Sequence, residues 1–162
     1  AEINYPRHAF MEHHRSTPLD HRRTRIASVL IGIGLMAAVD EIVFHQLLAW
    51  HHLVDGYSGA VALASDGALH SAELLFLIAG LFMAKQLIET QRLARADFTA
   101  GLLLGAGGFQ TFDGIVDHKI LGLHQVRYVD TIWPYDVAWI GAGLIVFCLG
   151  LYQLRRAANM TP

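Results

Sequence analysis

The sequence reads DEIVFHQLLAWH from Asp40 to His51 and DGIVDHKILGLH from Asp113 to His124. The second stretch begins 73 positions after the first, and both aspartates and both pairs of histidines recur at that spacing. Each copy lies in an apolar segment long enough to cross a bilayer. Ionisable side chains at membrane depth are costly and are usually retained for a function. The duplication therefore predicts one site built between two halves of the chain.

The composition indicates a membrane protein. The chain has 162 residues, of which 54% are hydrophobic and 16% charged, and its mean hydropathy is +0.38. This is too apolar for an ordinary soluble domain. A net charge of -2 gives no indication of nucleic-acid binding. A single cysteine, Cys148, excludes an internal disulfide framework, a two-cysteine metal clip and a covalently attached haem.

Four segments satisfy the length rule for membrane spans, at residues 26–50, 64–88, 98–121 and 135–154. We expect an all-α polytopic membrane protein, a four-transmembrane-helix bundle made of two parallel helical-hairpin repeats. The first repeat covers about 26–90 and the second about 97–156. Together they form a transmembrane domain at 25–156, between a polar tail at 1–24 and a short tail at 157–162.

Basic residues predict the orientation. Ten arginines and lysines lie before the first span, between spans two and three, or after span four, whereas Lys119 and Arg127 alone lie near the other connections. The positive-inside rule then places both termini in the cytoplasm, with the protein in a bacterial inner (cytoplasmic) membrane. Whether the N-terminal histidines His8, His13, His14 and His21 bind metal is left open.

The repeat extends beyond the polar motif. Gly32 and Gly34 recur as Gly105 and Gly107, and small residues at matching places favour close contact between spans one and three. At an offset of 70, Asp66 matches Asp136. His70 and Glu73 have no such match, because Ile140 and Gly143 occupy those positions. The halves are related in structure but differ in chemistry.

Span two carries the pattern Asp66-x-x-x-His70-x-x-Glu73, which lies on one helix stripe within about 40°. Counted inward along regular helices, His45, His70 and His118 lie at one depth, about 9 Å below the outer surface. This common depth predicts one shared metal site that opens toward the outside. Its expected ligands are His45, Asp66, His70, Glu73, Asp113 and His118.

The remaining polar residues are expected to support those ligands or to relay protons. They are Asp40, Glu41, His51, Asp117 and His124. On a regular helix His45 and His118 lie about 140° from the stripe that carries the aspartates and the later histidines. Local unwinding near the glycines would be needed to turn such groups inward.

Imidazole and carboxylate ligands suit borderline transition metals. Affinity order favours copper, with iron or zinc as the other candidates, in a site of one or two ions. The chain would then be a redox or metal-handling protein, and if it is an enzyme, a metal-dependent membrane oxidoreductase. Three alternatives stay open: a proton- or ion-coupled transporter or channel subunit, a b-type haem protein with His45 and His118 as axial ligands, and a purely structural subunit.

Three stretches, at residues 40–46, 66–70 and 112–125, resemble a family of small bacterial four-span membrane proteins known as domain of unknown function 2243. The resemblance covers nearly all of the chain after Arg25. It implies no specific activity, but it does imply a link to respiratory copper chemistry, since members are encoded near assembly factors for copper-containing terminal oxidases. Asp66-x-x-x-His70 is also similar in spacing to an intramembrane copper site of particulate methane monooxygenases. The expected partners are the lipid bilayer and either a second copy of the chain or a larger membrane complex.

Overall fold

The computed structural model describes residues 17–159, and this part of the chain is all-helical, without a strand. Helix α1 (His21–Val39) continues into a π-helix, η1 (Asp40–Leu47), and α3 (Arg95–Phe112) continues into a second, η2 (Asp113–Leu121). The other two helices are α2 (Gly59–Glu89) and α4 (Trp133–Asn159). The tail residues His8, His13 and His14 lie outside the described residues.

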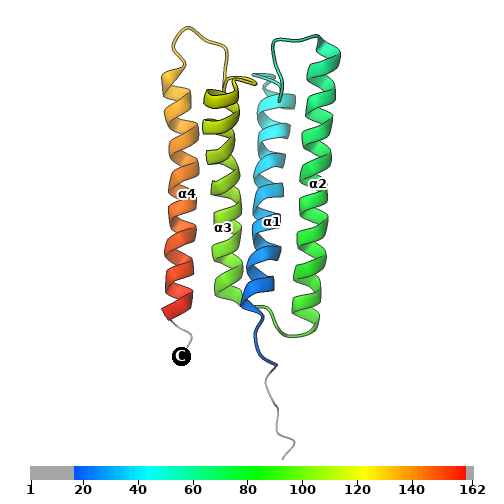
Figure 1. Cartoon of the computed structure of the whole chain (residues 1–162), viewed down its shortest axis with the longest axis vertical. Helices are drawn as coiled ribbons and strands as arrows, with labels where there is room; N and C mark the ends of the chain where they lie inside the picture. Colours follow the sequence, from blue (N-terminus) through cyan, green and yellow to red (C-terminus); the bar gives the residue numbers. More distant parts are fainter. Residues whose placement is uncertain (1–16, 160–162) are drawn as a thin grey trace, which may run out of the picture.

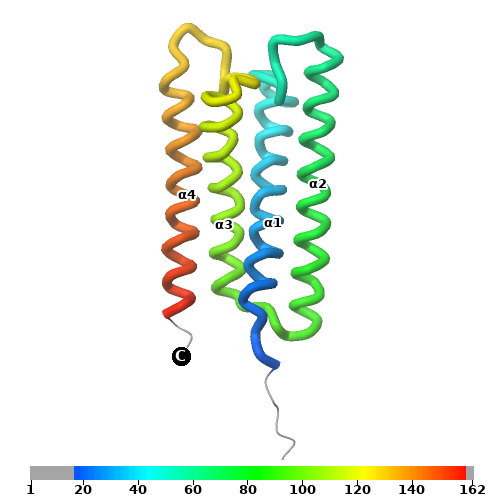
Figure 2. The backbone as a smooth tube through the Cα atoms, in the orientation of Figure 1, coloured from blue at the N-terminus to red at the C-terminus, as the bar shows by residue number. Residues whose placement is uncertain are grey.

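The four helices lie side by side in the order α2, α1, α3, α4 (Figures 1 and 2). Helix α1 packs against α2 and α3, and α3 packs against α4, whereas among residues 17–159 helix α2 contacts neither α3 nor α4. The four described helices therefore form a single layer rather than a bundle closed around a central core. Both outer helices expose long apolar side chains such as Leu75, Phe82 and Ile145, which lipid can cover.

Glycines set the helix contacts within this layer. A Cβ atom at Gly32 would meet a backbone carbonyl of α3, and one at Gly105 would meet a backbone carbonyl of α1. Gly34 approaches the backbone of α2 in the same way, and Gly107 approaches that of α4. Gly32 and Gly105 thus allow the close approach of α1 and α3, whereas Gly34 and Gly107 allow the close approach of an outer helix, α2 or α4. The prediction that segments one and three face each other is confirmed.

Three helices are long and apolar enough to cross a membrane: His21–Leu47, Gly59–Glu89 and Trp133–Asn159. With 31 residues, α2 is about 46 Å long, enough for the hydrocarbon core and both headgroup regions. The helix formed by α3 and η2 has 18 and 9 residues and is not among these three. It contains three aspartates, at positions 97, 113 and 117, together with Lys119.

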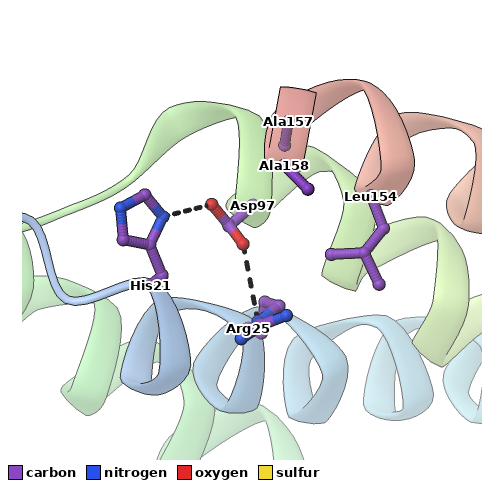
Figure 3. A pocket seen from close by; sticks show the side chains of 6 residues that line it. All are labelled: His21, Arg25, Asp97, Leu154, Ala157 and Ala158. Atoms are coloured by element: carbon purple, nitrogen blue, oxygen red, sulfur yellow. Dashed lines mark hydrogen bonds and ion pairs between the residues drawn. The ribbon is translucent and has the colours of Figure 1, made fainter. Parts of the chain in front are cut away.

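The two long connections, residues 48–58 and 122–132, lie at the same end of the layer, which we call the loop end (Figure 1). At the opposite end the buried carboxylate of Asp97 joins α3 to α1. Its Oδ2 accepts a hydrogen bond from His21 Nδ1 at 2.7 Å, and its Oδ1 lies 3.4 Å from Arg25 Nε. These three residues line a hollow of about 270 Å³ beside the end of α4 (Figure 3).

We expect Gly105→Leu to destabilise the protein by about 1–3 kcal/mol or more, because the new side chain has to displace the α1 backbone. Gly141→Leu is the control, since a Cβ atom at Gly141 has no neighbour within 4 Å. Thermal unfolding of the detergent-solubilised protein measures both. Equal midpoints for the two variants would contradict this account of the α1–α3 contact.

Candidate metal centre

Both π-helices begin at the repeated aspartates and carry the first histidine of each motif. Asp40 and His45 are five residues apart, as are Asp113 and His118. In an α-helix such residues point about 140° apart. A π-helix closes i→i+5 hydrogen bonds and therefore brings residues five apart onto one face. The expected local unwinding thus occurs at the aspartates themselves, and it turns each histidine toward its aspartate.

The connections at the loop end return the second histidine of each motif to the same place. The chain leaves η1 through Ala49, at φ 47°, and leaves η2 through Gly122, at φ 63°. These residues are again 73 positions apart. The left-handed turns redirect the chain, so His51 and His124 lie on the loops with 4% and 1% of their surface exposed. A regular helix continued to Trp50 would instead have placed His51 near the membrane surface.

Two hydrogen bonds fix the orientation of these loop histidines. His51 Nδ1 lies 2.8 Å from the carbonyl oxygen of Val126, and His124 Nδ1 lies 2.9 Å from that of Leu53. A carbonyl oxygen only accepts, so each Nδ1 carries the proton and each neutral ring presents a lone pair at Nε2. Each loop therefore holds the histidine of the other loop, and both Nε2 atoms are available as ligands.

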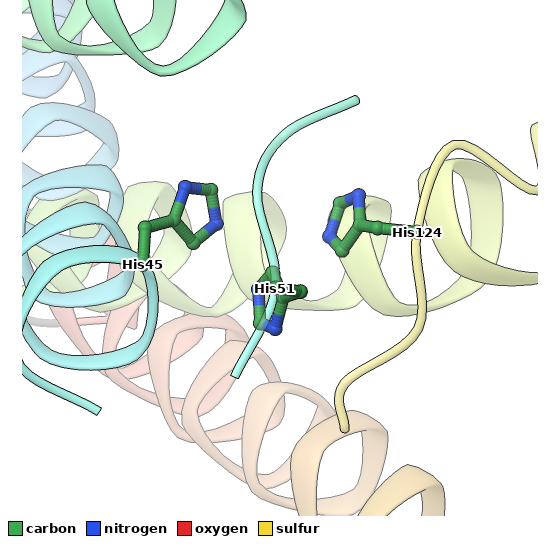
Figure 4. Close-up of side chains that lie close together, drawn as sticks. All are labelled: His45, His51 and His124. Atoms are coloured by element: carbon green, nitrogen blue, oxygen red, sulfur yellow. The ribbon is translucent and has the colours of Figure 1, made fainter. Parts of the chain in front are cut away.

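The four imidazoles form one compact group, which we call the histidine cluster: His45, His51, His118 and His124. Within each motif the two ring centroids are 4.5 Å and 4.4 Å apart, at interplanar angles of 74° and 76°. Across the motifs His45–His124 and His51–His118 are both 6.0 Å apart, while His51 and His124 stack at 4.5 Å. Figure 4 shows three of these rings gathered from η1 and the two loops.

Asp113, His118 and His124 have the spacing of ligands around one ion. The two Nε2 atoms are 2.8 Å apart, and they lie 3.1 Å and 3.6 Å from the carboxylate of Asp113. With metal–nitrogen bonds of about 2.0–2.1 Å, ligand atoms around one ion are roughly 2.9–3.4 Å apart. In the first motif, Asp40 lies at 3.7 Å from His45 Nε2 and 3.8 Å from His51 Nε2, which is slightly wider. The Asp113 set is thus one that could hold a metal ion, and the Asp40 set repeats its arrangement at longer distances.

A carboxylate pair lies behind His45. Its Nδ1 is 2.9 Å from Glu41 Oε2 and 3.1 Å from Asp66 Oδ1. Asp66 is further held by His52 Nδ1 at 2.6 Å and by the backbone N–H of Leu53 at 2.8 Å. The hydrogen bond to Asp66 raises the pKa of His52. Carboxylates commonly orient metal-ligating histidines through the ring nitrogen that does not bind the ion, and the pair matches that arrangement.

The site has buried polar atoms that lack hydrogen-bond partners. Among the described residues these include Asp40 Oδ1, His45 Nε2 and His51 Nε2, and the three residues are 1–4% exposed. Buried polar groups are nearly always hydrogen-bonded, since an unsatisfied one costs about 1–3 kcal/mol. The two imidazoles belong to the histidine cluster, and Asp40 lies beside both of them. A bound cation would satisfy them together.

Three combinations of side chains offer ligand atoms within 4.8 Å of one another. They are His45 with His51 and His124, Asp113 with His118 and His124, and Glu41 with His45 and Asp66. His124 belongs to two of these groups and His45 to two. The centre is thus continuous from η2 to α2.

Four of the six expected ligands lie in the three groups. His45 contacts Asp66 and His118 contacts Asp113, and His124 shares a group with each of these histidines. His70 and Glu73 lie apart, in none of the three groups. His70 is half-exposed on α2 and its Nδ1 contacts Glu73 Oε1 at 2.5 Å. The expectation that His70 shares a site with His45 and His118 stays a prediction.

The residues expected to play a supporting role divide in the structure. His51 and His124 lie at the centre of the site, Asp40 contacts both histidines of its motif, and Glu41 lies behind His45. Asp117 is partly buried on η2 and belongs to no group of potential ligands. The sequence offered one signal for the central role of His51 and His124, namely the repeated interval between the two histidines of each motif. It offered none for the carbonyls of Leu53 and Val126.

The second half encloses its aspartate with an aromatic side chain. Trp139 Nε1 donates a hydrogen bond of 2.8 Å to Asp113 Oδ2, and Gln110 Nε2 donates one of 3.0 Å to the Trp139 carbonyl. The indole lies against Gly114, where a Cβ atom would meet Trp139 and Ile140. Glu41 occupies the corresponding position in the first half. The absence of a side chain at Gly114 therefore makes room for Trp139.

Comparison with known proteins identifies the family. The family model described as predicted membrane protein (DUF2243) matches residues 27–157, so the chain belongs to that family. Neither a curated protein nor a solved structure matches the chain.

We expect Trp139→Phe to lower the unfolding free energy by about 1–3 kcal/mol, because it leaves Asp113 Oδ2 without its indole donor inside the protein. Trp133→Phe is the matched control, since Trp133 is 65% exposed. Denaturant or thermal unfolding in detergent compares the two. The assignment fails if both variants lose the same stability.

Proposed function

We propose that this member of the DUF2243 family is an integral membrane metalloprotein whose histidine cluster, with Asp40 and Asp113, holds one or two transition-metal ions. One observation carries the proposal. His51 and His124 donate their Nδ1 protons to carbonyl oxygens, and His45 directs its Nδ1 to carboxylates, so three Nε2 atoms are directed into one buried space. This is the arrangement that outer hydrogen bonds impose on metal-ligating histidines.

Copper is the ion that we favour. The ligands are imidazole nitrogens and carboxylate oxygens, and at such sites copper binds more tightly than iron or zinc. Two separate sets of ligand atoms, Asp40 with His45 and His51 in the first motif and Asp113 with His118 and His124 in the second, support a centre of two ions. A copper ion there would supply one-electron redox chemistry or a store for delivery to another protein. The six ligand residues have only 1–4% of their surface exposed, so a substrate has little room to reach the ion. This favours electron transfer or metal handling over catalysis on a bound substrate.

The membrane arrangement is part of the proposal. We infer four spans in two parallel hairpins, with both termini in the cytoplasm and the loop end at the outer face of a bacterial inner membrane. Equivalent features at a spacing of 73 residues support the repeat: both π-helices, both left-handed turns and both loop-to-loop hydrogen bonds. The metal centre then lies just beneath the outer boundary of the bilayer.

The geometry gives less support to the two main alternatives. A proton or ion pathway requires polar groups along the whole layer, yet along α1 no buried polar residue lies between Ser28 and Asp40. A b-type haem requires a slot for the porphyrin between His45 and His118. The cluster instead packs its rings against one another, with centroids 4.4–6.0 Å apart.

Purified protein loaded with Cu²⁺ and then desalted should retain copper in fixed stoichiometry. His124→Ala should lose most of it, because His124 belongs to two of the three potential ligand groups. His51→Ala should weaken binding as well. Elemental analysis gives the copper content per chain, and circular dichroism verifies that the variants remain helical.

His21→Ala is the control, since His21 pairs with Asp97 at the opposite end of the layer. It should retain copper like the unmodified protein. The proposal would be abandoned if the unmodified protein retained no copper, iron or zinc, or if His124→Ala and His21→Ala retained equal amounts.

The orientation has its own test. In a Cys148→Ser background, Ser58→Cys lies in a loop-end connection and Gln91→Cys lies in the connection between α2 and α3. A membrane-impermeant thiol reagent should label the first in intact spheroplasts and the second only after lysis. The reverse pattern would invert the inferred topology.

A further inference from the structure

We propose that metal ions reach the histidine cluster through a lateral entry site on the first half, formed by Glu41, Asp66 and His70. The inference rests on the metal-binding function proposed above and adds the route and the residues that admit the ion. A centre whose ligands are 1–4% exposed needs such a path.

The entry site is a surface hollow of about 230 Å³ between η1 and α2. Its polar lining consists of Glu41, Gln46, Asp66 and His70. Two of these groups are carboxylates and the third ligand-type group is an imidazole, so the hollow attracts cations and offers both nitrogen and oxygen ligands. His70 has 51% of its side chain exposed, and so it is accessible to an arriving ion.

The wall of the hollow contains a buried carboxylate. Glu41 is 3% exposed, its Oε1 accepts a hydrogen bond from Gln46 Nε2 at 2.8 Å, and its Oε2 lies against the ring of His45. Glu41 and Asp66 lie in the wall between the hollow and the cluster. Both line the hollow, and both contact His45 Nδ1, at 2.9 Å and 3.1 Å. One imidazole therefore separates an ion in the hollow from the centre.

The position along α2 places the hollow at the membrane boundary. Asp66 lies seven residues from the start of α2, about 10 Å along the helix, and His70 lies about 16 Å along it. Because α2 is about 46 Å long and the hydrocarbon core about 30 Å thick, some 8 Å at each end lies among headgroups. On this count Asp66 lies about 2 Å inside the hydrocarbon boundary and His70 about 8 Å inside it, so the hollow begins just beneath the headgroups.

The second half does not repeat the ligand set of this hollow. The positions that match Glu41, His70 and Glu73 hold Gly114, Ile140 and Gly143. Trp139 and Ile140 occupy the space beside Gly114, and the carboxylate that matches Asp66, Asp136, pairs with Lys119 Nζ at 2.7 Å. A lysine ammonium there repels a second cation. The ligand set at the entry site is therefore an addition to one half rather than a feature of the repeat.

Two variants test the route without touching the histidine cluster. Gly67 lines the hollow, and a Cβ atom there has no neighbour within 4 Å, so Gly67→Phe can fill the space without a clash. His70→Ala removes the exposed imidazole. We expect both to slow Cu²⁺ uptake by metal-free protein in lipid nanodiscs roughly tenfold, the change produced by about 1.4 kcal/mol. The final copper content should equal that of the unmodified protein.

Matched controls come from the second half. Val137→Phe and Ile140→Ala change the positions that correspond to Gly67 and His70, and they should load at the unmodified rate. Uptake is followed by stopped-flow absorption, with elemental analysis at the end point. An unchanged rate in either test variant overturns the entry site, as does a lower final copper content in His70→Ala, which would make His70 a resident ligand. If the unmodified protein takes up no copper at all, the metal-binding proposal itself fails.

Discussion

The exchange of hydrogen bonds between the two loops holds the centre together. His51 from one loop bonds the Val126 carbonyl of the other, and His124 returns the same contact to Leu53. Since each bond fixes a tautomer as well as a position, the two loops also determine which nitrogen faces the cluster. Neither hairpin can complete its half of the site alone. These bonds also link the loops that lead into α2 and α4, two helices that do not contact each other within residues 17–159.

The π-helices meet a second geometric requirement. A carboxylate and an imidazole from one helix must converge on a single ion, and a spacing of five residues achieves that only where the helix widens. The widened turns keep their backbone groups paired through i→i+5 hydrogen bonds. Along the regular helices before these turns, α1 and α3 are packed closely, with Gly32 and Gly105 each against the backbone of the other helix.

Sequence alone was sufficient for the helices and for most of the polar residues of the centre. Apolar length and the repeated motif identify all four helices, and the glycine pairs identify the central contact. The sequence could not reveal the single layer, because lipid covers apolar faces as readily as another helix does. It also could not place His51, His124 and His70, since depth along a regular helix gives no information about π-turns or about loops that fold back. Backbone acceptors such as the Val126 carbonyl leave no mark on the sequence.

The difference between the halves shows how a duplicated framework can combine retention with access. An ion held by well-oriented imidazoles dissociates slowly, and a fully symmetric and enclosed cluster would be equally slow to fill. In the second half Trp139 closes the site and donates to Asp113, which favours retention. In the first half Glu41 and Asp66 contact the same ring nitrogen of His45 and also face the surface hollow, so charge and hydrogen bonding lead outward from the cluster. On the proposed route one carboxylate pair would do both tasks on the first half, orienting a ligand and attracting the next ion, whereas in the second half the matching carboxylate, Asp136, is paired with Lys119.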